Sequence, residues 1–186
     1  MSDEDGLPRL YIQNIATHCS LNCKIDLKRL THLGSFKEDH LKLKASVVWL
    51  HDPKCSALIF AKGQMVVVGM TSETLAIQAM LRAIRAIKPF YPEIRMSKYK
   101  TNNILATGKF EGDWIDVERY AKDNNTGADF SPEKFPGLRI NVVNPVDPTK
   151  RLTATVFMSG KIVLQVRSLS LFPGFCRVSQ AEFRRY

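Results

Sequence analysis

Cysteines and histidines are the residue types of this chain that most often bind metals or act as nucleophiles, and they are scattered along the sequence. They are Cys19, Cys23, Cys55, Cys176, His18, His32, His40 and His51. No two cysteines form a Cys-x-x-Cys pair, and no histidines stand at zinc-finger spacing. We therefore interpret the cysteines as free, mostly buried thiols in a reducing compartment. A metal site formed by Cys19, Cys23 and His18 is the alternative interpretation.

The acidic residues also lack a catalytic pattern. Asp26 and Asp116 each precede an apolar helical pattern, so we interpret them as helix caps rather than catalytic acids. The sequence contains no nucleophile motif and no glycine-rich loop that would hold a phosphate. We expect a protein that is not an enzyme and has neither a metal nor a cofactor.

The charge of the chain favours a polyanionic partner. Its 27 Lys and Arg residues exceed its 18 Asp and Glu residues, which gives a net charge of +9. Up to Arg95 there are 13 basic and 9 acidic residues, and after it 14 and 9, so the excess belongs to the whole body of the chain. An evenly basic surface can neutralise phosphates and release counterions. A basic protein without such a partner is the simpler alternative.

Composition limits the class of protein. Apolar residues make up 45% and charged residues 24%, which is typical of a globular domain and excludes a disordered tail or a coiled coil. No run approaches the roughly 20 apolar residues that cross a bilayer. The chain begins with the acidic stretch Met-Ser-Asp-Glu-Asp-Gly, unlike a secretory signal. We expect a soluble, intracellular protein with no membrane partner.

The sequence contains an internal duplication. IQNIATHCSLNCKID at 12–26 resembles TNNILATGKFEGDWID at 101–116, and ALIFAKGQMVVVG at 57–69 resembles ATVFMSGKIVLQV at 154–166. The offset is 89 residues between Asn14 and Asn103 and 97 residues between Gly63 and Gly160. Because the matching words occur in the same order, we interpret the chain as two copies of one unit.

Each copy predicts the same order of elements. In the first copy these are a helix after Asp26 that ends at Gly34, a strand over 43–51, a hairpin of 56–61 and 64–70, and a helix from Ser72 to Lys88 before Pro89. In the second copy, Asp116 begins the short helix and 158–161 forms the hairpin turn. Pro173-Gly174 prevents a continuous long helix there, which leaves Val178–Tyr186 for a last helical turn or two.

These elements predict an α+β fold in which a curved, ten-stranded antiparallel sheet forms a saddle with helices on its convex face. The other face would lack a cover, yet the strands carry the apolar runs Val66–Val68 and Ile162–Leu164 close to Phe60 and Phe157. An uncovered apolar sheet face indicates a binding surface, unless an unidentified element covers it.

Several of these words resemble the core domain of the TATA-box-binding protein family. They are QNI at 13–15, CKIDLK at 23–28, ALIF at 57–60, EKFPGL at 133–138 and SGKIVL at 159–164. The resemblance covers residues 9–167 well and the C-terminal segment poorly. It implies a short acidic extension at 1–10, a first repeat at 11–97 and a second repeat at 98–186 whose last helix is shortened.

The resemblance also implies a DNA-binding surface that acts in the minor groove. Wedging positions match Leu43 and Phe60 in the first repeat and Phe135 and Phe157 in the second, and kinking by apolar wedges is a known property of this family. Asn14 and Asn103 match the asparagines that donate to groove acceptors. The remaining matches are contacts to the groove floor, together with the lysine of the second hairpin turn: Ala16, Leu58, Val66, Val68, Leu105, Lys161 and Val163.

Some positions depart from the family pattern. Thr155 and Gln165 stand where the family has an apolar residue and a threonine, and Trp49 and Asn141 replace arginines that contact phosphates. Gln64 replaces a turn lysine. Lys42, Lys62, Lys161 and Arg151 are candidates for restoring part of that charge. Strict preference for a TATA element is therefore less well supported than affinity for duplex DNA in general.

Partner surfaces follow from the same resemblance. The loop with Glu133 and Lys134 resembles the contact for a factor like transcription factor IIB, and Arg82 and Arg85 remain from the basic helix that contacts a factor like transcription factor IIA or repressors. Other positions of both surfaces differ, so we expect fewer or co-adapted partners, which include TBP-associated factors.

The implied function is that of a nuclear general initiation factor that binds and bends promoter DNA and nucleates the preinitiation complex. One alternative is a related factor of the same fold with relaxed TATA specificity that acts mainly through protein partners. Another is a scaffold whose concave face binds a protein chain. The sequence alone leaves these alternatives open.

Overall fold

The computed structural model describes residues 9–31, 36–39, 45–110, 114–124, 128–143 and 151–168. The chain forms two compact units. We call Gln13–Asn103 the first half, and Ile104–Tyr186 with Met1–Ile12 the second half. Within the described residues, no helix is long and apolar enough to cross a membrane.

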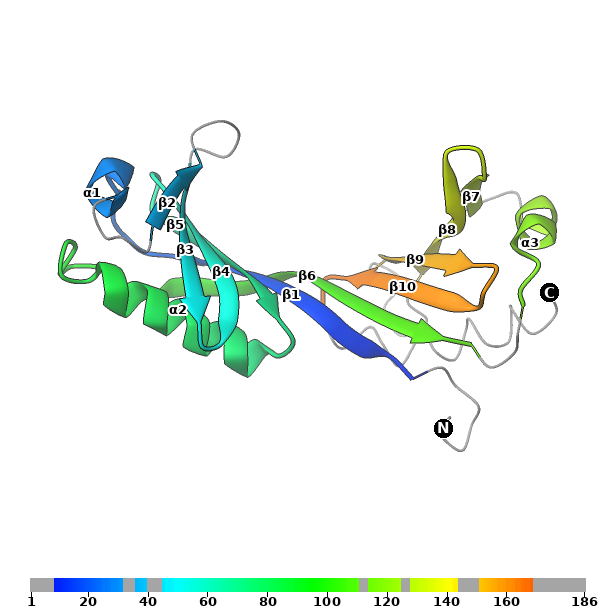
Figure 1. The fold of residues 1–186 in the computed structure, drawn as a ribbon, viewed down its shortest axis with the longest axis horizontal. Helices are drawn as coiled ribbons and strands as arrows, with labels where there is room; N and C mark the ends of the chain where they lie inside the picture. Colours follow the sequence, from blue (N-terminus) through cyan, green and yellow to red (C-terminus); the bar gives the residue numbers. More distant parts are fainter. Residues whose placement is uncertain are drawn as a thin grey trace. The chain divides into compact units, whose positions relative to one another are not determined.

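The first half is an antiparallel sheet with helices on one face (Figure 1). Its elements are β1 (Tyr11–Ser20), α1 (Leu27–Thr31), β2 (Phe36–Asp39), β3 (Ala45–His51), β4 (Lys54–Phe60), β5 (Gln64–Met70) and α2 (Glu73–Ile87). The strands lie in the order β2-β3-β4-β5-β1, so the consecutive strands β2 to β5 lie side by side and β5 pairs with β1, the first strand of the chain.

Helix α2 lies along one face of this sheet and forms the core with it. Ala76, Ala79, Ala83 and Ile87 recur at helical spacing and are fully buried, which allows the helix to approach the strands closely. Ser72 caps the helix, because its Oγ accepts from the amide of Leu75 at 3.2 Å. The helix expected from Ser72 to Lys88 is therefore confirmed.

The strand predictions were accurate at β5 and displaced at β4. Strand β5 spans Gln64–Met70 as expected, whereas β4 begins at Lys54 and ends at Phe60 rather than spanning 56–61. The reason is the tight turn at Asp52-Pro53, which pairs His51 directly with Lys54 and lets the ladder resume at once.

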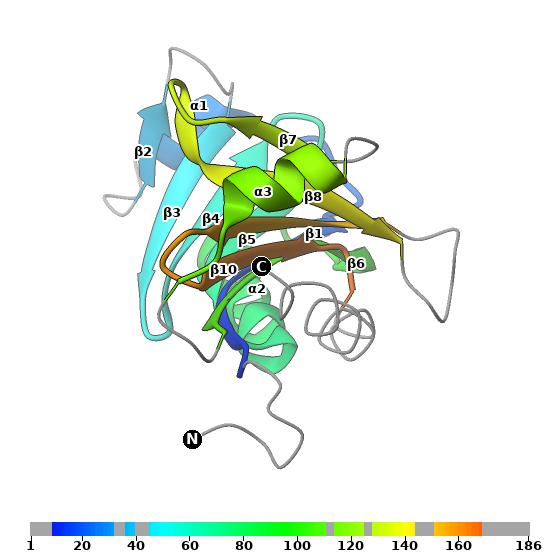
Figure 2. The same ribbon diagram turned by 90° about the vertical axis from the view of Figure 1, so that its right-hand side faces the viewer.

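The second half has the same pattern of strands. It contains the C-terminal part of β6 (Ser97–Lys109) from Ile104 on, then α3 (Val117–Asp123), β7 (Ala128–Ser131), β8 (Phe135–Val143), β9 (Arg151–Phe157) and β10 (Lys161–Val166). Their order is β6-β10-β9-β8-β7, and β8, β9 and β10 run side by side in Figure 2. Asp116 caps α3 by accepting from the amide of Arg119 at 2.9 Å, as expected.

Several expectations fall outside the described residues. These are the end of the first short helix at Gly34, the position of Leu43 and Lys42, and the whole segment 169–186 with its Pro173-Gly174 break. They stay predictions.

Candidate nucleic-acid interface

The first half has a sheet face that neither of its described helices covers. Residues of β4 and β5 alternate strictly, so that Ala57, Ile59 and Val67 are buried against α2 while their neighbours point the other way. We call the half-buried or exposed residues on that other side the first open face. They are Ala16, His18, Val47, Trp49, Ser56, Leu58, Phe60, Val66 and Val68.

The centre of the first open face is apolar, while polar side chains lie around it. Leu58 lies opposite both Val47 and Val66 in the two adjoining ladders, which produces a continuous row of three apolar side chains. Trp49 is 55% exposed at the next position along β3. An apolar row of this kind, left open to solvent, is typical of a surface that binds another molecule.

The second half has an equivalent face, which we call the second open face. It alternates with buried residues such as Ala154, Ile162 and Leu164. Its members are Leu105, Thr107, Arg139, Asn141, Thr153, Thr155, Phe157, Val163 and Gln165. The ladders place Thr155 opposite Val163 and Arg139, so the row that is apolar in the first half is mixed here.

Two aromatic side chains meet at one end of the second open face. The rings of Phe135 and Phe157 pack edge to face with their centroids 5.8 Å apart, and Phe135 remains 44% exposed. Gly137, which pairs with Phe157, makes this possible. A Cβ atom on Gly137 would lie 2.6 Å from Cε1 of Phe135 and 3.0 Å from Cε1 of Phe157. The sequence prediction brought these two phenylalanines together but missed the glycine, whose signal is its place in EKFPGL.

The predicted wedge of the first half is described only in part. Phe60 ends β4 and lies opposite Gln64 across the hairpin, half-buried on the first open face. Its expected companion, Leu43, lies outside the described residues.

The two predicted asparagines lie on β1 and β6. Oδ1 of Asn14 accepts from the amide of Gly69 at 2.7 Å, and Gly69 has a φ of +98° that favours glycine. Because the amide oxygen is used in this bond, the NH2 group of Asn14 is the part that remains to contact a ligand as a donor. Asn103 is half-buried on β6, next to Asn102, whose Oδ1 lies 2.8 Å from Nδ1 of His18.

Exposed cations border the second open face. Lys161 lies opposite Lys109 at the end of β10, and Arg139 stands in the middle of β8. Like charges placed opposite each other repel, so this pair of lysines favours the binding of an anion between or beside them.

The predicted partner residues lie on two separate exposed regions. Arg82 of α2 is paired with Asp52, donating to its carbonyl oxygen and lying 3.1 Å from Oδ2, while Arg85 of the same helix is exposed. Glu133 and Lys134 are exposed in the turn between β7 and β8.

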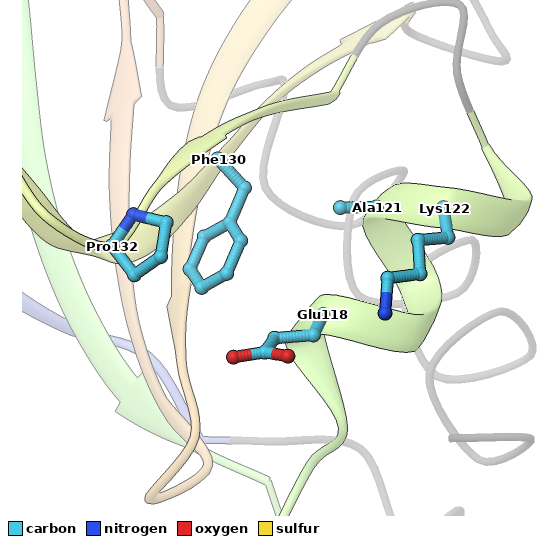
Figure 3. Close-up of a pocket in the computed structure, with 5 residues that line it drawn as sticks. All are labelled: Glu118, Ala121, Lys122, Phe130 and Pro132. Carbon is cyan, nitrogen blue, oxygen red and sulfur yellow. The ribbon is translucent and has the colours of Figure 1, made fainter.

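A cavity of about 470 Å³ lies beside that turn, between α3 and β7 (Figure 3). Phe130 and Pro132 form one wall, and Glu118 and Lys122 extend from α3 on the other. An apolar wall opposite a pair of opposite charges can hold an amphipathic segment of a protein. Sequence reasoning located the loop but missed the part that α3 contributes.

Burial makes the described thiols harder to ionise than a free cysteine. Burial raises the pKa of Cys19 to about 11, and burial together with the negative charge of Glu93 raises the pKa of Cys23. Burial also raises the pKa of Cys55. No cluster of three potential ligands occurs among the described residues.

Comparison with known proteins identifies the family. The sequence model described as "Transcription factor TFIID (or TATA-binding protein, TBP)" matches residues 9–90 and 98–168. The chain is 33% identical to the TATA-box-binding protein of Candida albicans over 82% of this chain, and 28% identical to the TBP-related factor of Drosophila melanogaster over 86% of this chain. It spans 62% of the former relative's length and 69% of the latter's.

The fold agrees with that assignment. The structure of Methanococcus jannaschii TBP matches with a TM-score of 0.79 and 22% identity, covering 96% of this chain and all of that one. The chain therefore belongs to the TATA-binding protein family, a family of transcription factors. It has the two-repeat TBP-like fold with a large antiparallel sheet and a few helices. A role as a transcription factor rather than an enzyme fits this family.

Proposed function

We propose that this protein binds double-stranded promoter DNA in the minor groove, bends it, and nucleates assembly of the preinitiation complex in the nucleus. The observation that supports this most is the pair of open faces, one with an apolar centre and one mixed, whose residues alternate with buried ones along the strands. In this proposal the strands of both halves form one curved ten-stranded sheet, a saddle with the helices on its convex face. The DNA lies against the concave face.

The proposed repeats are residues 11–97 and 98–186, after an acidic extension at 1–10. The contacts with DNA are those expected from the sequence: the wedges Leu43, Phe60, Phe135 and Phe157, the donors Asn14 and Asn103, and the floor residues with Lys161. Eight of these residues lie on the open faces as defined above: Ala16, Leu58, Phe60, Val66, Val68, Leu105, Phe157 and Val163.

The energetics of this mechanism depend on opposing terms. Bending a duplex of 20–30 base pairs by tens of degrees costs on the order of 1–6 kcal/mol. Insertion of Phe135 and Phe157 beside an unstacked base step, contact of the apolar rows with the groove, and release of counterions by the +9 chain must offset that cost. The edge-to-face pair of rings suits insertion, because Phe135 is exposed and the missing Cβ of Gly137 leaves room for both rings.

Partner contacts are proposed for the two exposed regions described above. Glu133 and Lys134, with the cavity beside α3, would contact a factor like transcription factor IIB. Arg82 and Arg85 on the outer side of α2 would contact a factor like transcription factor IIA, a TBP-associated factor or a repressor. The pairing of Arg82 with Asp52 is an exposed one, worth at most about 1 kcal/mol, so it can yield to an acidic partner.

Alanine substitution of the aromatic pair tests the proposal. We expect Phe135→Ala and Phe157→Ala each to weaken binding of a labelled TATA duplex by at least about tenfold, because apolar wedging is lost. Leu81→Ala is the matched control, since Leu81 is an equally exposed apolar residue on α2. If both phenylalanine variants bind like the control variant, the wedge mechanism is wrong. If both variants still bind DNA but no longer bind partner proteins, the scaffold alternative replaces the proposal.

A related factor with relaxed TATA preference is the second candidate. The polar residues Arg139, Thr155 and Gln165 on the second open face favour it, because side chains that form hydrogen bonds can contact G·C as well as A·T pairs in the minor groove. Under this candidate, a TATA duplex and a scrambled duplex bind alike in the assay above.

A further inference from the structure

The two open faces differ in chemistry at positions that the duplication makes equivalent. The offset of 97 residues relates Leu58 to Thr155 and Val68 to Gln165. The ladders extend the equivalence to the next strand, because Val47 pairs with Leu58 as Arg139 pairs with Thr155. In each pair the first half has an apolar side chain and the second half has a polar one.

A fourth pair follows the same rule. Trp49 lies opposite Ser56, and Asn141 lies opposite Thr153, at the equivalent place on the ladder. Asn141 is tied to its neighbour, since its Oδ1 accepts from Oγ1 of Thr153 at 3.2 Å. Four equivalent positions thus change from apolar to polar, whereas Val66 and Val163, and Phe60 and Phe157, keep their type. The change is confined to part of the face and spares the phenylalanine that ends β4 and its equivalent at the end of β9.

The minor groove offers a specific reason why this difference matters. A·T and T·A pairs present only acceptors there, and a G·C pair adds the N2 amino group of guanine, which is a donor. Val66 and Val68 have no acceptor, so a guanine amino group pressed against them would lose its hydrogen bond to water without replacement. Gln165 is exposed and carries both an amide oxygen and an NH2 group, so it can accept from guanine or donate to adenine and thymine.

Thr155 and Arg139 are the other polar groups beside this site. Thr155 adds a hydroxyl that can donate or accept. Arg139 is exposed and lies one strand further from β10 than Thr155, where the ladder pairs it with Asp129 of β7. Gln165 instead lies opposite Leu105 and Thr153, which carry no charge. The amide oxygen of Gln165, which would accept from a guanine amino group, therefore lies away from the positive charge of Arg139 on β8.

We infer that the second open face accepts G·C base pairs through Gln165, while the first open face accepts only A·T pairs. The inference rests on the proposed function, because it assumes that both faces contact the minor groove. The target is then a bipartite element, and a G·C pair in one half of it fixes the direction in which the protein binds.

The test compares end-labelled duplexes that contain an A·T-only element, G·C pairs in one half, or G·C pairs in both halves. The complex can turn to place a single G·C-containing half against the second open face. We expect that duplex to bind within about threefold of the A·T-only duplex, and the doubly substituted duplex to bind on the order of tenfold more weakly. Equal weakening by one and by two substituted halves would overturn the inference.

Replacement of guanine by inosine isolates the amino group, because inosine keeps the pairing with cytosine and lacks the N2 donor. In the Gln165→Val variant, the ratio of affinities for the A·T-only and one-half G·C duplexes should rise on the order of tenfold, and inosine should restore it. The reverse variant, Val68→Gln, should rescue the doubly substituted duplex. Leu81→Ala is the control for the ratio. An unchanged ratio in Gln165→Val contradicts the inference.

The direction of binding supplies a second readout. In a Trp114→Phe variant, Trp49 is the sole tryptophan of the chain and lies in the first half. A dansyl group is attached either to the A·T end or to the G·C end of the one-half G·C duplex. Energy transfer from Trp49 should be stronger to the label at the A·T end. Equal transfer at both ends would overturn the inference. Binding of all duplexes no better than a scrambled one would instead show that the proposed function itself has failed.

Discussion

Gly137 is the residue on which the geometry of the aromatic pair depends most directly. It is buried, it pairs with Phe157 across the ladder, and its missing Cβ leaves the space that the rings of Phe135 and Phe157 occupy. A methyl group there would come within 2.6 Å of a ring carbon of Phe135 and of Cγ2 of Thr155. The rings are the parts that can move, so they must turn away.

We predict that Gly137→Ala weakens binding of a TATA duplex by about tenfold, comparable to the loss of one ring, while the protein stays folded. Titration of the labelled duplex measures the affinity, and urea unfolding followed by circular dichroism measures the stability. Unchanged affinity in a folded variant would show that the position of the rings does not matter for binding.

Single residues also show where sequence reasoning reached its limit. Asn14 was identified from its resemblance to family positions, but its bond to the amide of Gly69 depends on the bulged pairing of β1 with β5, which no local pattern shows. The difference between Val47 and Arg139 was likewise hidden, because it needs the registers of two ladders as well as the repeat.

At the scale of elements, helix α2 and strand β5 were predicted well because local signals agree with their surroundings. Ser72 caps α2, Pro89 follows its end, and its small apolar residues recur on the face that the sheet buries. Strand β4 was misplaced at its start because Asp52-Pro53 forms a tighter turn than the pattern indicates. The sequence predicted the open faces only in outline. Side chains alternate between the two faces of a strand, but this alternation does not tell which face a helix covers.

Strand β1 supplies a test of the buried core. Cys19 on β1 is fully buried, and burial raises its pKa from 9.0 to about 11. The folded state therefore disfavours the thiolate, which the unfolded state forms above pH 9. The stability that depends on the neutral thiol is fully present below pH 9 and is lost as the pH rises through about 11.

We predict that between pH 8.5 and pH 11 the free energy of unfolding falls by about 2 kcal/mol more in the wild type than in Cys19→Ala. Urea unfolding at several pH values measures both proteins. The difference between the two proteins removes the contribution of the other groups that ionise at alkaline pH. These include Cys23, Cys55 and Tyr99, whose pKa values burial also raises. Parallel curves would show that Cys19 is not the buried group described here.

For the whole molecule, the net charge of +9 makes affinity for DNA depend on salt. Lys161 lies opposite Lys109 at the border of the second open face, where a phosphate would relieve their repulsion. Lys88 is exposed at the C-terminal end of α2, which packs against the opposite face of the first half's sheet. Of Lys161 and Lys88, only Lys161 belongs to the proposed interface.

We therefore predict that Lys161→Gln lowers the slope of log affinity against log salt by about 1 in magnitude, as expected for one lost phosphate contact. Titrations of one duplex at four salt concentrations give the slope. Lys88→Gln should keep the wild-type slope. If the two variants change it equally, the charge acts through the whole molecule rather than at the open face.

The central claim is that the open faces bind the minor groove and bend the duplex. Its most direct test is energy transfer between dyes at the two ends of a duplex that carries a TATA element, compared with a scrambled duplex at two salt concentrations. We predict tighter binding to the TATA duplex and an increase in transfer that reports a bend, both lost in Phe157→Ala. Equal, steeply salt-dependent binding to both duplexes with no change in transfer would contradict the account.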